Sequence, residues 1–167
     1  MFVNAIAPFI MCSKLKPLLM PQEQSANSAV NDIDDQVSIS NSISEHAAGI
    51  IVNVTALEGK FNVGKKSSGH PHTNMAKAAL NMLTLTAARD YARSNIFISS
   101  VDTGWVTDMS PGGVGATSRK HETFVGPPLD DEDGASRVLD PLFSYVNSGG
   151  KVKMFGHFYK DYMKASW

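Results

Sequence analysis

The chain predicts an α/β fold in which a short parallel sheet of about three strands is covered by helices on both faces. Helical and strand patterns alternate along its 167 residues, and two strand candidates are continuous aliphatic runs. Such alternation is typical of a parallel sheet, and a continuous aliphatic run is typical of a strand buried on both faces. Hydrophobic residues make up 43% of the chain, enough for one domain with a core.

The N-terminal part predicts one helix followed by an insertion. Apolar side chains recur at helical spacing over residues 2–20, and Pro8 should disturb the first part of that helix. Residues 21–48 are rich in Ser, Asn, Gln and Asp and lack periodicity, which is typical of a surface or disordered insertion. We expect a single domain, 1–167, that contains this insertion.

The middle of the chain predicts two buried strands joined by a helix. The strands are the β-branched run 50–55 and the run 96–101. Between them, a broad apolar stripe predicts a helix that opens near His72 and continues to about residue 93. Thr73 and Lys77 lie four residues apart there, so they should be surface neighbours, and the ammonium can lower the pKa of a hydroxyl at the first position.

The last third predicts a loop, a helix and a final strand. Glycine and proline residues mark the loop 102–128, and the acidic run 130–133 opens the helix. Acidic side chains complement the dipole at a helix N-terminus, so the run needs no ligand to explain it. With a last strand at 152–159, right-handed crossovers place the last helix opposite the first two and bring the carboxyl ends of the strands to one edge, where such folds bind ligands.

Charge and cysteine content narrow the expected partners and location. Fifteen basic against sixteen acidic side chains give a net charge of −1, so no overall field favours nucleic acid or an anionic membrane. Cys12 is the single cysteine, which fits a buried thiol in a reducing compartment. No basic residue precedes the apolar start of the chain, and Asn4 and Pro8 interrupt it. We therefore expect a cytoplasmic protein without a signal peptide or membrane span.

Two motifs suggest chemistry that their context argues against. Residues 59–65 resemble a nucleotide phosphate loop, but Lys66 stands where magnesium binding requires Ser or Thr, and the next helix begins several residues later. His70 and His72 flank a proline, with no Cys or carboxylate at the spacing of a zinc site, so no metal is expected. A solvated basic loop and surface histidines explain both motifs.

Four further motifs occur in the order and spacing of a known family. They are VNAIAPF in the first helix, IIVNVTALEG at the first strand, MAKAAL in the second helix and SVDTGWVTDM after the second strand. With them the chain resembles the C-terminal half of the short-chain dehydrogenase/reductase family, in divergent form. The resemblance implies a partial Rossmann-like three-layer sandwich and an oxidoreductase that uses NAD or NADP on a carbonyl or alcohol substrate.

The resemblance assigns roles to four residues of this chain. Asn4 matches the helix asparagine that holds a proton-relay water. Lys77 matches the lysine that binds the nicotinamide ribose and lowers the pKa of the catalytic tyrosine. Gly104 matches the glycine of the turn after the later strand, and Thr107 matches the threonine that reaches the nicotinamide carboxamide.

Other positions depart from the family pattern. Ala56 stands at the position of the catalytic serine and Thr73 at that of the tyrosine. An alkanol is several pKa units less acidic than a phenol of pKa ~10, so Thr73 is a poor general acid, and capping the helix is its alternative role. Thr55, if the strand end shifts, or His72, whose imidazole titrates near neutral pH, could supply a replacement proton path.

A larger departure lies at the front of the chain. The family's glycine-rich phosphate loop does not precede the first helix, so we expect weak cofactor binding and weak or no turnover by the isolated chain. The alternatives are a non-catalytic dimerising or regulatory module and the truncated product of a reductase gene. The family dimerises through the first two helices, so the resemblance also implies a homodimer. Without the family's preceding strands one parallel edge of the sheet is unpaired, which favours aggregation unless residues 21–48 or a partner cover it.

Overall fold

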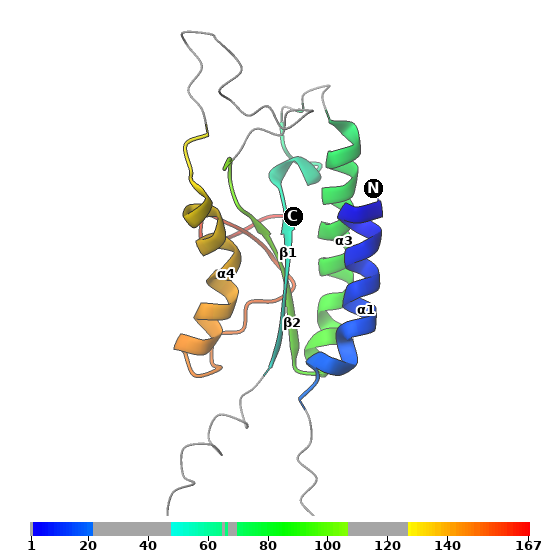
Figure 1. Cartoon of the computed structure of the whole chain (residues 1–167), viewed down its shortest axis with the longest axis vertical. Coiled ribbons are helices and arrows are strands. Elements are labelled where there is room, and N and C mark those ends of the chain that lie inside the picture. The colour runs from blue at the N-terminus through cyan, green and yellow to red at the C-terminus, as the bar shows by residue number, and fades with distance from the viewer. Residues whose placement is uncertain (1, 22–47, 65, 67–69, 107–126) are drawn as a thin grey trace, which may run out of the picture.

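The computed structural model describes residues 2–21, 48–64, 66, 70–106 and 127–167 (Figure 1). The chain order of the elements is η1 (Phe2–Ile6), α1 (Ala7–Leu19), β1 (Gly49–Thr55), η2 (Leu57–Gly59), α3 (Pro71–Arg93), β2 (Ile96–Asp102), α4 (Asp131–Asn147), β3 (Phe158–Lys160) and β4 (Met163–Ala165). The inserted stretch 21–48 and much of the loop 102–128 lie outside the described residues.

The described elements form three layers. The sheet has the order β1-β2-β3-β4, in which β1 and β3 both pair with β2 in parallel and β4 pairs with β3 antiparallel. Helices α1 and α3 lie side by side on one face, and α4 covers the other (Figure 1). The predicted α/β sandwich, with the first two helices opposite the last, is confirmed.

The last strand differs from its prediction. Residues 152–159 were expected to extend as one third strand, but β3 holds only Phe158–Lys160 and turns directly into β4. Gly156 at φ +68° bends the chain before β3, and both turn residues, Asp161 and Tyr162, have positive φ. Two left-handed residues between antiparallel strands match the right-handed twist of a hairpin. The sheet therefore gains a fourth, antiparallel strand that the prediction lacked.

The core lies between β2 and the two helices of its α1/α3 face. All seven residues of β2 are buried, because strands flank it on both sides and helices cover both faces. One buried cluster joins the three elements: Cys12, Ala88, Tyr91, Ile96 and Ile98. The predicted burial of the Cys12 thiol is confirmed, and that burial raises its pKa.

A buried hydrogen-bonded group links β1, α3 and β2. The Thr84 hydroxyl accepts from Asn53 Nδ2 at 2.9 Å and from Ser100 Oγ at 2.8 Å. All three side chains are buried, so their polar atoms depend on one another for partners. The group fixes α3 over the two central strands.

The N-terminal helix is apolar and largely exposed. Residues Phe2–Leu19 have a mean hydropathy of 1.3, and 11% of them are buried. By length and composition alone this helix could cross a membrane, although no membrane span was predicted from the sequence. The side chains of Phe9, Ile10 and Leu18 are all more than one third exposed, so α1 presents apolar surface to its surroundings.

Replacing Thr84 by valine is expected to destabilise the fold. The substitution Thr84→Val keeps the shape but removes the acceptor for two buried donors, and each orphaned donor costs about 1–3 kcal/mol. Urea unfolding followed by circular dichroism should show a loss of about 2 kcal/mol or more. The matched change Thr86→Val, at an exposed position of the same helix, should change stability by less than about 0.5 kcal/mol. Equal effects of the two substitutions would contradict this account.

Candidate functional site

A cavity of about 410 Å³ lies at the carboxyl ends of β1 and β2. We call it the carboxyl-end cavity. Its walls come from the end of β1 with η2, from Lys77 of α3, from the turn after β2 and from Lys160 of β3. The edge of a parallel sheet at which the strand ends meet is the usual place for a ligand in this class of fold.

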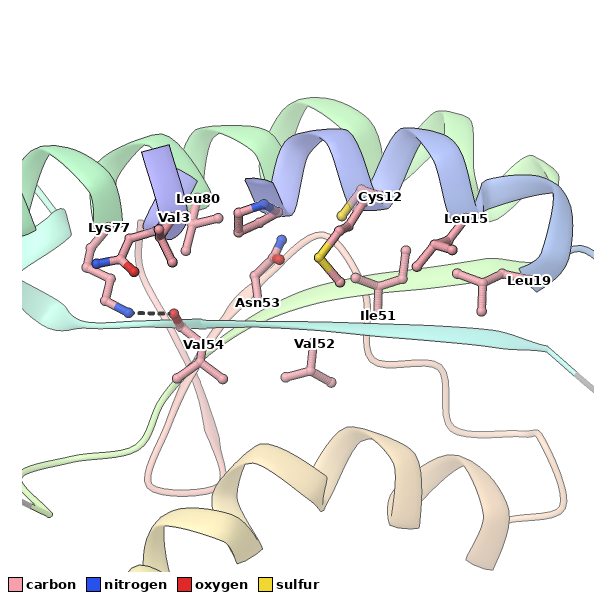
Figure 2. A pocket seen from close by; sticks show the side chains of 13 residues that line it. Val3, Cys12, Leu15, Leu19, Ile51, Val52, Asn53, Val54, Lys77 and Leu80 are labelled. Atoms are coloured by element: carbon pink, nitrogen blue, oxygen red, sulfur yellow. Dashed lines mark hydrogen bonds between the residues drawn. The ribbon is translucent and has the colours of Figure 1, made fainter. Parts of the chain in front are cut away.

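Lys77 is held at the boundary between this cavity and the edge of β1. Its Nζ donates a hydrogen bond to the Val54 carbonyl at 2.8 Å (Figure 2). Thr55 Oγ1 donates to the Lys77 carbonyl at 3.2 Å. Burial lowers the pKa of the Lys77 ammonium, and the nearby Asp102 carboxylate opposes part of that shift.

Gly59 lets the turn after β1 approach α3 closely. A Cβ added at this glycine would lie 2.7 Å from the Lys77 carbonyl carbon and 2.8 Å from the Ala78 nitrogen. Real Cβ atoms do not come so near to backbone atoms, so a larger residue would push η2 away from the helix. The absence of a side chain at this point keeps Lys77 beside the end of β1.

Asp102 ties the two turns of the cavity together. Its carboxylate accepts from the Leu57 N–H at 2.7 Å and from the Gly104 N–H at 2.6 Å. Lys160 Nζ lies 3.5 Å from the same carboxylate. Sequence reasoning missed both Asp102 and Lys160. The available signal was an acidic residue at the end of a buried strand, directly before a Thr-Gly turn.

The backbone conformation and surroundings of Gly104 require a residue without a side chain. Its φ is +77°, in the left-handed region, and a Cβ there would lie 2.5 Å from Leu129 Cδ1. The glycine thus lets the turn after β2 pass under the segment that leads into α4. Gly104 lines the carboxyl-end cavity, and its role in cofactor binding stays a prediction.

The structure brings some of the predicted site residues together. Lys77, Ala56, Thr55 and Gly104 all line the carboxyl-end cavity. Asn4 lies in a neighbouring groove of about 340 Å³ between α1 and β1, which Lys77 also lines. We call this the α1-side groove; Figure 2 shows Lys77 at one end of it and Leu19 at the other.

Three other predicted residues stand apart from the cavity or cannot be placed. Helix α3 begins at Pro71, and its N-cap is His70 at φ +58°, whose carbonyl accepts from the Thr73 N–H at 3.0 Å. Thr73 is therefore inside the first turn, and its alternative role as the N-cap is wrong. Thr73 is partly buried and His72 exposed, and neither lines the described cavities. Thr107 lies outside the described residues.

Comparisons with known proteins give the fold a reference. No family model matches the chain. An uncharacterized protein of Acanthamoeba polyphaga mimivirus is 34% identical over 118 residues, which are 65% of this chain and 24% of that protein. The carbonyl reductase Sniffer of D. melanogaster aligns with a TM-score of 0.59 at 17% identity, over 99% of this chain and 55% of its own. The Sniffer protein of Caenorhabditis elegans aligns with a TM-score of 0.55 at 15% identity, over 99% of this chain and 53% of its own.

These likenesses establish the fold. Over its described elements the chain shares the Rossmann-like architecture of the two Sniffer proteins. It spans about a quarter of the mimivirus protein and about half of each Sniffer protein. The expected partial Rossmann-like fold is confirmed.

The lowered pKa of Lys77 predicts a pH dependence of stability. The folded pKa lies below the unfolded value of ~10.4, so the unfolded chain binds more protons between the two values. The contribution of Lys77 to stability therefore rises with pH through that window. In Lys77→Met this contribution is absent, so the free energy of unfolding of the variant minus that of the wild type should decrease as the pH rises from neutral toward ~10.4.

Urea unfolding across this pH range measures that difference. Lys14→Met removes a lysine from an exposed position of α1 and should shift stability by the same amount at every pH. If the stability differences of both variants changed with pH in the same way, burial of Lys77 would not be the cause of that change.

Proposed function

We propose that this chain is a homologue of the short-chain NAD(P)-dependent oxidoreductases, directed at a carbonyl or alcohol group, with weak or no turnover as an isolated chain. The supporting observation is the carboxyl-end cavity, where Lys77, Ala56 and Gly104 meet. These are the positions that the sequence resemblance assigned to the lysine, the serine and the glycine turn of such an enzyme. The Rossmann-like fold supports the same proposal.

The cavity suits the nicotinamide-ribose end of a dinucleotide. Lys77 lines it from α3, and its ammonium could donate to ribose hydroxyl groups. A nicotinamide cofactor supplies hydride transfer to or from the substrate carbon. Lys160 and Asp102 line the same cavity and would set the charge around the reacting group.

The starts of α3 and α4 do not suit the pyrophosphate. Helix α3 begins with a proline, Pro71, which has no N–H to offer. At α4 the Asp130 carboxylate already caps the Asp133 N–H, and the first turn carries three acidic residues. Both features oppose phosphate binding. Anchoring of the distant half of the cofactor is therefore weak, which limits how well the reacting end is positioned.

The proton path is also short of donors. Ala56 carries no hydroxyl, and the hydroxyl of Thr55 donates to the Lys77 carbonyl. Lys77 lines the same cavity, and its Nζ donates one of its hydrogen bonds to the Val54 carbonyl. A lowered pKa makes this ammonium a better acid than an ordinary lysine.

A non-catalytic, dimerising or regulatory module is the second proposal. Its support is the apolar surface of α1 and α3, where Phe9, Ile10, Met75 and Met82 are each about half exposed or more. Exposed apolar area of this kind marks protein contacts. A homodimer through these two helices would bury it. A truncated gene product with no role of its own is the third alternative.

Thermal unfolding with NADPH tests the leading proposal. With a dissociation constant on the order of 1 mM, about 5 mM NADPH stabilises the native state by about 1 kcal/mol, which is roughly 3 °C in a domain of this size. Lys77→Ala should abolish the shift, whereas Lys14→Ala should retain it. A micromolar dissociation constant would contradict the weak anchoring.

The remaining outcomes separate the proposals. A shift unaffected by Lys77→Ala would place NADPH away from the carboxyl-end cavity. No shift in the wild-type chain would favour the non-catalytic module.

A further inference from the structure

Strand β1 has an open edge within the described residues. It pairs with β2 on one side, and the sheet order places no strand on the other. The Gly49 N–H donates to the Asn95 carbonyl on the β2 side at 3.1 Å. Because alternate residues of a parallel strand point their backbone groups to the same side, those of Ile50, Val52 and Val54 face the open edge.

One of these edge groups already has a partner. The Val54 carbonyl accepts from Lys77 Nζ at 2.8 Å, which agrees with its outward direction (Figure 2). The N–H and C=O of Ile50 and Val52 and the N–H of Val54 remain directed outward. An added strand would find these groups along an edge of about 23 Å for seven residues.

Apolar walls flank this edge on both faces of the sheet. The α1-side groove is roofed by Met11 and Leu15 of α1, above Ile51. On the opposite face a groove of about 410 Å³, the α4-side groove, lies between β1 and the side chains of Leu139 and Leu142. In Figure 2, Ile51 points toward α1 and Val52 toward α4. A strand added here would thus place its alternate side chains in two apolar grooves.

We propose that the open edge of β1 binds an extended strand of another polypeptide, one with aliphatic side chains on both of its faces. Backbone hydrogen bonds would hold it on the edge, and the two grooves would select its side chains, as in other cases of strand addition. Continuous aliphatic runs are the mark of strands buried on both faces. Almost half of each Sniffer chain lies outside its match to this chain, so proteins with this fold carry further polypeptide beyond the part matched here.

The chain's own insertion has the wrong side-chain pattern for this role. In residues 22–47 the aliphatic side chains alternate with or are separated by Ser, Asn, Asp and Gln. As a strand, such a segment would place polar side chains in one of the two grooves and leave them without partners there. The grooves therefore favour a different strand.

A second copy of the chain fits poorly as well. A twofold pair of β1 strands, about 4.8 Å apart, would bring two α1 helices over the same seam. Each α1 already roofs the space beside its own β1, and a helix with side chains is about 10 Å wide. A single strand that brings no helix of its own over the open edge fits this space, whereas a symmetric copy of the chain does not. The proposal does not depend on the oxidoreductase function.

Amide hydrogen exchange, resolved by NMR on the ¹⁵N-labelled chain, tests the proposal. The probe is a synthetic peptide with a continuous Val/Ile run between lysine pairs. Its addition should slow exchange at Ile50, Val52 and Val54 by about tenfold or more, and leave Ile51 and Asn53, which already face β2, unchanged. A control peptide in which every second Val/Ile is Ser should give little protection.

Two variants of α4 provide a matched control. Leu139→Asp changes a wall residue of the α4-side groove that is 40% exposed, and should weaken peptide protection at least tenfold. Phe143→Asp changes a residue of the same helix that does not line the groove and is 51% exposed, and should leave protection unchanged. The wild-type comparison of the two peptides stands on its own if either variant fails to fold.

Four outcomes would overturn the proposal. Protection of the edge amides without peptide in dilute solution would mean that the chain covers its own edge. Protection that grows with protein concentration would identify a second copy as the occupant. An equal response to both peptides would remove the role of the two grooves, and no response to the aliphatic peptide would remove the binding site.

Discussion

The candidate site depends on the hydrogen bonds that the Asp102 carboxylate accepts. This carboxylate accepts hydrogen bonds from the Leu57 and Gly104 N–H groups, so a single side chain at the end of β2 holds the turns that follow both central strands. Those two turns carry Ala56 and Gly104 into the same cavity. Without this carboxylate, two partly buried amides would lose their acceptor, and the walls of the cavity would lose their common anchor.

Lys77 joins this site to the open edge of the sheet. Its backbone is fixed by the close approach of Gly59 and by the hydrogen bond from Thr55, while its ammonium reaches the Val54 carbonyl. The residue lines both the carboxyl-end cavity and the α1-side groove. The chemistry proposed for the cavity and the binding proposed for the edge therefore meet at one side chain, although each is argued from separate contacts.

The sequence was sufficient to predict the fold where local pattern and tertiary burial agree. The aliphatic runs of β1 and β2 and the apolar stripe of α3 are signals of this kind, and their bounds lie within a residue or two of the structure. The hairpin of β3 and β4 was missed because its strands hold three residues each and its turn residues, Asp161 and Tyr162, are not the usual Asn-Gly or Asp-Gly pair.

The site was predicted in part. A family resemblance could place Lys77 and Gly104, because both belong to short motifs. Asp102 could not be recognised, since one of its amide partners lies 45 residues earlier in the chain and only folding brings them together. The start of α3 at Pro71, behind a left-handed His70, likewise leaves no trace in an apolar periodicity, so the N-cap could not be assigned.

The buried group of Asn53, Thr84 and Ser100 has a consequence for strand alignment. A run such as that of β1, aliphatic at nearly every position, gives little discrimination between one alignment with β2 and another shifted along it. Asn53 interrupts the aliphatic run; it pairs with Ser100 in the observed register, and both side chains reach Thr84. A slip by one residue would turn the amide to the opposite face and set an aliphatic chain against two hydroxyls. The hydrogen bonds of Asn53 and Ser100 to Thr84 thus favour the observed alignment of β1 with β2.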